Sequence, residues 1–219
     1  MNLALIIARA GSVRIKNKNI KNFYGKPVIA YPIQTLQKSK IFSKIYVSTD
    51  SKKIAKISKR YKANVPFLRP KNLANNKTST LKVIKHFIKT LKISPNINIC
   101  CVYPVSPLLT VSTLMKAYKK FRLRKGNFLV PIQKATGAEN KVFKIDKRKQ
   151  IIKYNNSKSL FKDTGQFYFG TAKSFIKKNS ILFSGSTRTM LISKKSGIDV
   201  NTIDDWNLLK KLFKNKRYD

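Results

Sequence analysis

A short segment near the amino terminus constrains the fold more than any other, because residues 3–8 form an unbroken apolar run. The polar turn sequence Arg9-Ala10-Gly11-Ser12 follows it directly. A strand that is apolar on both faces is typical of a parallel sheet, since helices cover both sides of such a sheet. Residues 45–50 and 97–104 are also of strand length and end in polar or turn-forming residues, so we expect them to be further strands.

Amphipathic helical patterns separate these strands. Apolar residues recur at three- and four-residue spacing in residues 26–38, 52–61, 79–93 and 111–123. Pro27 is acceptable in the first turn of the first helix, where its missing N–H is not needed. Further strands are expected at residues 65–68, 128–131 and 165–170, and further helices from Ala172 and over residues 206–213. This order predicts an α/β fold, a three-layer α/β/α sandwich with a mostly parallel, Rossmann-like sheet.

Residues 133–162 differ from the rest of the chain. They are polar, weakly periodic and rich in Lys and Asn, and we interpret them as a hairpin or projecting arm. No internal repeat or linker composition divides the 219 residues, so we expect a single domain spanning residues 1–219.

The chain is strongly basic, with 48 Lys and Arg residues against 8 Asp and Glu and a net charge of +40. Such a charge by itself suggests a nucleic-acid-binding protein. The lysines are scattered along the whole chain and Asn and Ile are also abundant, as a coding bias toward A-rich codons would produce. We therefore expect no specific nucleic-acid partner and keep nucleic-acid binding as a distant alternative. With no membrane-length apolar run and no signal-peptide pattern, we expect a cytoplasmic protein without membrane insertion.

The sulfur and imidazole side chains carry little chemistry in this sequence. Cys100 and Cys101 are adjacent in a strand and should point to opposite faces, which indicates neither a disulfide framework nor a zinc site. His86 is the single histidine and has apolar neighbours in a Lys-rich helical pattern, so we expect it to be a packing residue.

The turn after the first strand has the composition of a phosphate site. Ligands of open α/β sheets bind beyond the carboxyl ends of the strands. A turn of small residues exposes backbone N–H groups that can hold phosphate oxygens, and Arg9, Arg14 and Lys18 would add positive charge around them. The segment matches neither the dinucleotide fingerprint nor the Lys-Ser/Thr phosphate loop. An ordinary glycine turn in a basic protein is the alternative.

Residues 3–20, which contain Arg9-Ala10-Gly11-Ser12-Val13-Arg14-Ile15 and Lys18-Asn19-Ile20, resemble the opening motif of the cytidylyltransferases that activate nine-carbon acidic sugars. Later stretches agree with this family in order and spacing: residues 23–27, 30–31, 47–50, 65–70, 78–81, 100–103, 131–133, 165–170 and 199–206. The resemblance covers nearly the whole chain. It is greatest to the members that act on pseudaminic acid, ahead of those for sialic, legionaminic and Kdo-type acids, on these stretches: Val65-Pro66-Phe67-Leu68-Arg69-Pro70, Cys100-Cys101-Val102-Tyr103, Pro131-Ile132-Gln133 and Gly165-Gln166-Phe167-Tyr168.

The resemblance implies transfer of CMP from CTP to an acidic nine-carbon sugar, with Mg²⁺ as the cofactor and pyrophosphate as the second product. Together with the phosphate-site composition, it indicates these nucleotide-binding residues: Ala8, Arg9, Ala10, Gly11, Ser12, Arg14, Lys18, Asn19, Arg69, Thr78, Ser79 and Thr80. The expected sugar-binding residues are Ser106, Gln133, Gln166 and Tyr168, and the expected metal ligands are Asp199 and Asn201. Arg9, Lys18 and Asp199 form the expected catalytic set. The resemblance also implies a homodimer that exchanges the arm at residues 133–162.

The sequence departs from the family pattern at three positions. Ala10 stands where a Gly is usual, Val13 stands where a Lys is usual, and Asn201 stands where the second metal carboxylate belongs. An Asn carbonyl oxygen can still bind Mg²⁺, but the site loses a full negative charge. These departures make a catalytically impaired nucleotide-binding relative one alternative to an active enzyme for pseudaminic acid. A synthetase for sialic or legionaminic acid is the other, because a few pocket side chains distinguish these sugars.

Overall fold

The computed structural model describes residues 1–219 except 124–125, 136–142, 147–150, 153–159 and 217–219. The central sheet contains β1 (Asn2–Ile7), β4 (Lys44–Ser48), β5 (Asn98–Val102), β6 (Phe128–Lys134), β9 (Phe161–Asp163), β10 (Phe167–Thr171) and β11 (Thr187–Leu191). The helices are α1 (Ala30–Lys38), α2 (Lys52–Arg60), α3 (Thr80–Thr90), α4 (Val111–Arg122), α5 (Ala172–Lys177) and α6 (Ile203–Lys216). Short 3-10 helices are η1 (Lys18–Ile20), η2 (Lys71–Leu73) and η3 (Lys194–Ser196).

The sheet is mostly parallel, as the apolar strands predicted. The strand order is β11-β6-β10-β5-β1-β4, and β9 pairs with the carboxyl-terminal end of β6. β1 pairs in parallel with β4 and β5, and β11 pairs in parallel with β6. β10 runs antiparallel between β5 and β6, so its beginning lies at the same edge as the carboxyl ends of the parallel strands.

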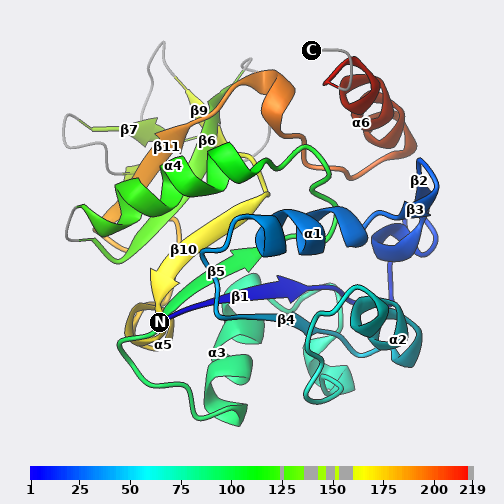
Figure 1. Ribbon diagram of the computed structural model, residues 1–219. Coiled ribbons are helices and arrows are strands. Elements are labelled where there is room, and N and C mark those ends of the chain that lie inside the picture. The colour runs from blue at the N-terminus through cyan, green and yellow to red at the C-terminus, as the bar shows by residue number, and fades with distance from the viewer. Residues whose placement is uncertain (124–125, 136–142, 147–150, 153–159, 217–219) are drawn as a thin grey trace.

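Helices cover both faces of the sheet, which confirms the three-layer sandwich (Figure 1). Ala4 and Ile6 of β1 pack with α1, α2 and α4 on one face, whereas Leu5 packs with α3 and α5 on the other face. Cys100 and Cys101 divide between the same two faces and are fully buried free thiols, as expected. This alternation follows from the two-residue period of a strand.

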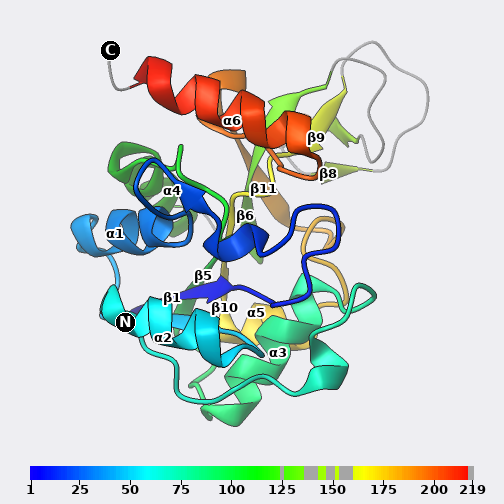
Figure 2. The same cartoon turned by 90° about the vertical axis from the view of Figure 1, so that its right-hand side faces the viewer.

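The last helix brings the carboxyl-terminal part of the chain over the carboxyl edge of the sheet (Figure 2). Trp206 of α6 packs edge-on against Phe23, with ring centroids 5.5 Å apart, and Phe213 lies 5.1 Å from the same ring. Phe23 belongs to a small hairpin of β2 (Asn22–Phe23) and β3 (Lys26–Pro27). This aromatic cluster fixes α6 and the segment before it against the first loop of the chain.

The helix expected from residue 26 begins only at Ala30, and Pro27 lies in β3. Tyr24 and Gly25 have φ angles of 46° and 87° and join β2 to β3 in a two-residue turn. Two consecutive residues with positive φ match the right-handed twist of a hairpin, which is why this turn type favours Gly. The prediction of Pro27 in the first turn of the helix is therefore wrong.

Other differences concern the edges of the sheet. The strand expected at residues 65–68 is reduced to an isolated bridge between Leu68 and Thr49, and Pro66 lacks the N–H that a ladder requires. β11 was not expected from the sequence, because its residues Thr187, Arg188 and Thr189 are polar, although they are buried. The Arg188 guanidinium donates to the carbonyl oxygens at the end of α4, at 2.9 and 3.0 Å, and these bonds let the strand be buried.

Part of the expected arm can be seen. Within residues 133–162, β7 (Lys144–Ile145) and β8 (Ile151–Ile152) form an antiparallel pair, and β9 begins at Phe161. Residues 136–142, 147–150 and 153–159 lie outside the described residues, so the arm and its role stay predictions. His86 packs its ring edge-on to Phe67 at 5.4 Å, as a packing residue does. Among the described residues, no helix has both the length and the apolar composition of a membrane span.

Candidate active site

A cavity of about 610 Å³ opens beyond the carboxyl ends of β1 and β5. It is lined by eight of the predicted nucleotide-binding residues: Arg9, Ser12, Arg14, Lys18, Asn19, Arg69, Thr78 and Thr80. They come from the loop after β1, the segment after β4 and the start of α3. The fold therefore gathers side chains that are up to about 70 residues apart in sequence at the edge where such sheets bind ligands.

The loop after β1 is held on two sides. The Asn19 side chain donates to the carbonyl oxygen of Arg9 at 2.8 Å, and Asn19 is buried. The N–H of Ala10 donates to Asp50 Oδ1 at 2.9 Å, and the N–H of Ser12 donates to the carbonyl oxygen of Ala10 at 2.8 Å. The N–H groups of Ala10 and Ser12 are thus engaged within the protein, contrary to the expectation that the turn leaves them exposed for phosphate.

Three residues of this loop region lie outside the cavity lining. Ala8 is fully buried and its N–H donates to the carbonyl oxygen of Ser48 at 3.0 Å. Ala10 lines a smaller neighbouring hollow, and Gly11 is exposed at the turn. Their contribution is to the path of the backbone, which brings the Arg9 and Arg14 side chains to the cavity.

Positive charge dominates this first cavity. Lys18 Nζ donates to the carbonyl oxygen of Val200 at 2.6 Å. Burial lowers the pKa of Lys18, and the charges of Arg14 and Arg9 lower it further, while Asp199 opposes them. Excess positive charge of this kind would be relieved by a ligand with several negative charges.

Arg69 is the most deeply buried cation of the cavity, with 4% of its surface exposed. Its Nη2 lies 3.9 Å from Asp50 Oδ1, and its Nε has no hydrogen-bond partner among the described residues. Burial lowers the pKa of Arg69, although Asp50 raises it. A buried guanidinium with an unused donor is suited to bind an anion in the cavity.

The opposite wall of the first cavity is built from amides and hydroxyls. Asn75 Oδ1 accepts from the N–H groups of Lys77 and Thr78, each at 2.9 Å, and this turn leads into α3. The Arg9 guanidinium donates to Asn76 Oδ1. Ser79 caps α3 by accepting from the N–H of Lys82, and it lines a second cavity and not the first.

This second cavity, of about 940 Å³, adjoins the first. Both cavities are lined by Thr80, Tyr103, Gly165, Ile198, Asp199 and Asn201. The second cavity also has carboxylates, Asp163 and Asp205, and apolar side chains from Ile181, Leu182, Leu208 and Leu212. A chain with only 8 acidic residues therefore places three of them, including Asp199, around one cavity.

Asp199 and Asn201 stand where the two cavities meet. The Asn201 side-chain amide donates to Asp199 Oδ2 at 2.8 Å, and Arg14 Nη2 donates to Asn201 Oδ1 at 3.1 Å. Asp205 Oδ2 accepts from the N–H groups of Asn201 and Thr202, at 2.8 and 2.7 Å. The carboxylate of Asp199 is exposed to both cavities, and Asn201 connects it to Arg14.

The expected sugar-binding residues divide into two groups. Gln133 and Tyr168 line the second cavity. Ser106 and Gln166 are each 2% exposed and are absent from the described lining of both cavities. Gln166 Nε2 donates to the carbonyl oxygen of Ser196 at 2.6 Å, so it supports the loop that precedes Asp199.

The loop before Asp199 is also held by the Gln133 side chain and passes close to the Gln166 side chain at Gly197. Gln133 Nε2 donates to the carbonyl oxygens of Ser193 and Gly197, at 2.7 and 2.9 Å. A Cβ at position 197 would lie 2.3 Å from Gln166 Nε2, so a larger residue there would have to displace the Gln166 amide. Gln133 and Gln166 therefore anchor the segment that carries Asp199.

The donor set at the junction fits a magnesium ion. Mg²⁺ prefers oxygen ligands and is usually held by one or two carboxylates together with substrate phosphates and water. Asp199 offers an exposed carboxylate beside the cation-lined cavity, whereas the Asn201 oxygen is engaged by Arg14. The described residues contain no group of three or more His, Cys, Asp or Glu side chains that could hold a metal without a substrate.

Sequence reasoning missed the roles of Asp50 and Tyr103 at this site, and it left Asp163 open between a substrate contact and a turn residue. Each follows or precedes a strand at the carboxyl edge of the sheet, a position that could have indicated them. Asp50 accepts a hydrogen bond from the Ala10 N–H and lies 3.9 Å from the Arg69 guanidinium, and Tyr103 lines both cavities.

An α/β sheet with a cation-lined cavity that meets a second cavity at a carboxylate has the arrangement of a nucleotidyl-transferring enzyme. The chain belongs to the cytidylyltransferase family, whose model matches residues 3–198. It is similar to the pseudaminic acid cytidylyltransferase of Campylobacter jejuni serotype O:2, with 34% identity over 224 residues that cover 97% of this chain and 96% of that protein.

Further relatives agree with this family. The CMP-N,N'-diacetyllegionaminic acid synthase of Legionella pneumophila is 32% identical, over 96% of this chain and 95% of that protein. Among solved structures, a CMP:2-keto-3-deoxy-manno-octonic acid synthetase complexed with CTP superposes with a TM-score of 0.78 over 98% of this chain and 99% of that chain, at 14% identity. This last likeness shows the fold.

Proposed function

We propose that this chain transfers the cytidylyl group of CTP to a nonulosonic acid, most similar to pseudaminic acid, and releases pyrophosphate. The observation that carries the proposal is the meeting of two unlike cavities at Asp199. The first is rich in cations and suits a triphosphate, and the second holds carboxylates and apolar groups and suits a sugar. The nonulosonic-acid relatives support this choice of acceptor.

In the proposed reaction, the anomeric hydroxyl oxygen of the sugar attacks the α-phosphorus of CTP. A new P–O bond forms, the bond to the β-phosphate oxygen breaks, and pyrophosphate leaves with the bonding electron pair while the hydroxyl proton is released. Negative charge therefore moves onto the leaving pyrophosphate. Arg9, Lys18 and Arg69 would stabilise that charge, because they are held in place before the reaction by Asn76, Val200 and Asp50.

The expected residues Thr78, Ser79 and Thr80 would border the base and ribose. Thr78 and Thr80 line the first cavity beside the Asn75 turn, and their hydroxyls can donate to or accept from a polar base edge. Mg²⁺ bound by Asp199 would neutralise phosphate oxygens and align the α-phosphate. Asn201 accepts a hydrogen bond from Arg14 and donates one to Asp199, so it would hold the Asp199 carboxylate in one orientation.

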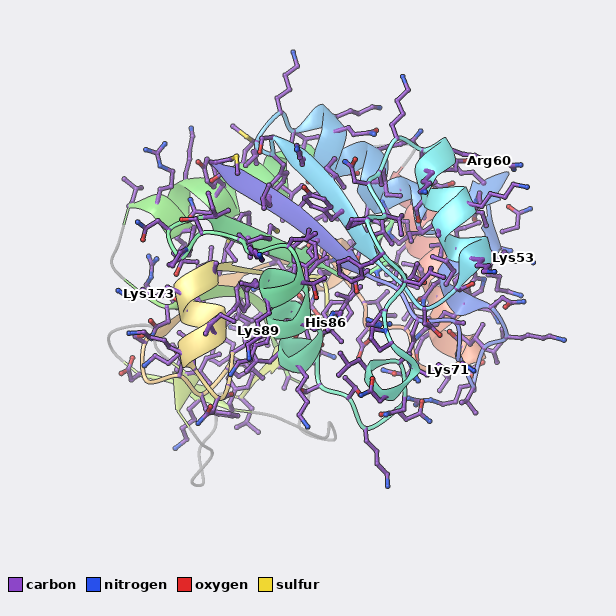
Figure 3. The ribbon with its side chains drawn as sticks, turned by 90° about the horizontal axis from the view of Figure 1, so that it is seen from below. Lys53, Arg60, Lys71, His86, Lys89 and Lys173 are labelled. Carbon is purple, nitrogen blue, oxygen red and sulfur yellow. The ribbon has the colours of Figure 1, made fainter. Side chains whose placement is uncertain are left out.

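The assembly and location are also part of the proposal. We infer a homodimer in which residues 133–162 contribute to the contact, and we infer a cytoplasmic enzyme. The cations of the surface come from different elements, with Lys53 and Arg60 on α2, Lys71 on η2, Lys89 on α3 and Lys173 on α5 (Figure 3). This distribution supports a generally basic surface with no specific nucleic-acid partner.

The test of the proposed function is turnover with CTP, Mg²⁺ and a panel of nonulosonic acids, measured as pyrophosphate release. We expect turnover, and we expect Asp199→Ala to abolish it while the circular dichroism spectrum is unchanged. Folded wild-type protein that turns over none of the sugars would contradict the proposal.

The second candidate is an impaired relative that binds nucleotide without turnover. The engagement of Asn201 by Arg14 favours it, because this position then supplies neither a charge nor a free oxygen to a metal. Calorimetric binding of CTP without pyrophosphate release would select this candidate.

A further inference from the structure

Asp50 comes two residues after the end of β4 and lies between two parts of the first cavity. The bridge between Thr49 and Leu68 places it beside Arg69, whose backbone N–H donates to the carbonyl oxygen of Thr49 at 2.7 Å. Asp50 Oδ1 accepts from the N–H of Ala10 at 2.9 Å and lies 3.9 Å from Arg69 Nη2. One carboxylate oxygen therefore faces both the turn after β1 and the buried guanidinium.

The two partners of Asp50 are of the kind that a phosphate group takes. Phosphate oxygens bind the backbone N–H groups of turns, and they bind the guanidinium of Arg. Asp50 meets both groups from inside the protein, because its side chain is 18% exposed and it is absent from the described lining of the first cavity. It is an internal anion beside the cavity, and it does not touch a ligand there.

The charge of Asp50 bears on a cavity that has few other anions. Four cationic side chains line the first cavity: Arg9, Arg14, Lys18 and Arg69. Asp199 is the only carboxylate in the described lining. Asp50 raises the pKa of Arg69, whereas burial and the charge of Arg9 lower it. Asp50 therefore offsets part of the positive charge that a bound anion would meet.

Such an offset affects substrate and product alike. CTP and pyrophosphate both carry a chain of phosphates, so extra positive charge strengthens the binding of both. Stronger binding of this uniform kind does not speed the chemical step. It slows the departure of pyrophosphate, and product release limits turnover in many enzymes. An anion placed beside the cations therefore favours release of the product.

We propose that Asp50 is a counter-charge that limits the affinity of the first cavity for polyphosphate, so that pyrophosphate can leave after the transfer. The inference rests on the proposed function for the identity of the product. Asp50 acts through Arg69 and the turn after β1, so it is a positioning residue and not a catalytic one.

The test is calorimetric titration with inorganic pyrophosphate in the absence of CTP and sugar. Asp50→Asn keeps the size of the side chain and an oxygen that can accept from the Ala10 N–H, and it removes the charge. We expect Asp50→Asn to bind pyrophosphate about tenfold more tightly than wild type, because a charge a few ångströms from a partly buried anion changes its affinity on this scale. Unchanged or weaker binding would overturn the inference.

Asp204→Asn is the matched control, because it removes one negative charge from the same chain. Asp204 is exposed in the first turn of α6 and lies outside the described lining of both cavities. Its charge is screened by solvent and salt, so we expect the pyrophosphate affinity to change by less than about twofold. An effect as large as that of Asp50→Asn would show that the net charge of the molecule acts, and it would overturn the role of Asp50.

Steady-state kinetics separates this role from a role in folding. Pyrophosphate should inhibit Asp50→Asn at about tenfold lower concentration, and the KM for CTP should fall, with no gain in kcat. A residue that only stabilises the fold would lower turnover without strengthening inhibition by pyrophosphate. Inhibition that is unchanged or weaker in Asp50→Asn contradicts the proposal.

Asp50→Ser serves where Asp50→Asn does not fold, as judged by circular dichroism. It removes the same charge with a smaller side chain, so its effect on pyrophosphate binding must have the same sign. Pyrophosphate binding by neither wild type nor the variants would overturn the inference. Tighter pyrophosphate binding by Asp50→Asn without turnover of any sugar by wild type contradicts the proposed function alone.

Discussion

At the scale of single residues, Asn201 shows how a neutral side chain can occupy a position where a charge is expected. Its amide donates to Asp199 and its oxygen accepts from Arg14. Arg14 and Asn201 are 187 residues apart in sequence, so these hydrogen bonds link Arg14 to Asp199 only in the folded chain. It keeps one carboxylate oriented, but it leaves the junction with a single exposed carboxylate for a divalent cation.

The first prediction concerns this charge. Asn201→Asp should lower the Mg²⁺ concentration needed for half-maximal turnover by about tenfold, the scale of changes around metal ligands. The reason is that a second carboxylate adds attraction for the cation at the same place. Turnover measured against Mg²⁺ concentration checks it. Asp204→Asn serves as a control for a change of charge, because Asp204 is exposed in the first turn of α6 and outside the described lining of both cavities. An unchanged Mg²⁺ requirement would show that position 201 does not face the ion.

The second prediction concerns how the charge of Asp163 lowers the free energy of unfolding. Burial raises the pKa of Asp163 from 3.8 to about 6, so the folded state holds its proton more tightly than the unfolded state. Stability from this group therefore falls as the pH rises from about 4 to about 6. Asp163→Asn should raise the unfolding free energy by about 1 kcal/mol at pH 7, after allowance for partial solvent access, and the gain should shrink toward pH 5.

Thermal unfolding of wild type and Asp163→Asn at these two pH values checks this prediction. A gain in stability at pH 7 that shrinks at pH 5 is the result expected for a buried carboxylate. A variant that is less stable at neutral pH would show that the charge is compensated in the folded state.

At the scale of elements, the start of α6 and the loop before it form one unit. Asp205 donates its N–H to Thr202 Oγ1 at 3.2 Å and accepts from the N–H of Thr202 at 2.7 Å, which is a capping box. Asp205 also accepts from the N–H of Asn201. The helix cap and the segment that carries Asp199 therefore share their hydrogen bonds, and the helix is fixed in turn by Trp206.

The third prediction separates these two roles of the cap. Thr202→Ala should lower the unfolding free energy by about 1 kcal/mol, the usual cost of a lost cap. It should also lower turnover or raise the Mg²⁺ requirement, because the loop with Asp199 loses its support. Thr110→Ala is the matched control, since Thr110 caps α4 by accepting from the N–H of Thr113 at 3.1 Å, away from both cavities.

Denaturant unfolding and turnover are measured for both cap variants. We expect equal losses of stability and a loss of activity in Thr202→Ala alone. Equal activity of the two variants would show that the cap acts on stability only.

At the scale of the whole molecule, the net charge of +40 is the dominant property. Like charges on a compact surface repel one another and destabilise the folded state, and salt screens this repulsion. The few carboxylates are concentrated at the site, with Asp50, Asp163, Asp199 and Asp205 all at the cavities or beside them. The rest of the surface therefore has little opposite charge to offset its cations.

The fourth prediction follows from this imbalance. Raising NaCl from about 50 mM to about 200 mM should raise the melting temperature and strengthen the proposed homodimer, because a shorter screening length weakens the repulsion between surface cations. Sedimentation at both concentrations measures the dimer, and sodium sulfate at equal ionic strength controls for the anion. A monomer under both conditions would contradict the dimer and its assignment to residues 133–162.

Local pattern was sufficient for the elements whose side-chain period is regular. The apolar run at residues 3–8 became β1, and the helical periods at residues 52–61 and 111–123 became α2 and α4 to within about a residue at most ends. The loop residues Arg9, Arg14 and Lys18 could be chosen because they follow a buried strand. These features depend on near neighbours in the chain, so the sequence by itself determines them.

Tertiary structure decided the rest, because long-range partners were needed. β11 is a buried strand only because Arg188 meets the carbonyl oxygens of Lys120 and Phe121 at the end of α4. The sequence is equally consistent with a turn role and a substrate contact for Asp163, and only the pairing of β9 with β6 and the hydrogen bond from Tyr168 place it on the wall of the second cavity. Buried polar groups require partners, and no local pattern states where in the chain those partners are.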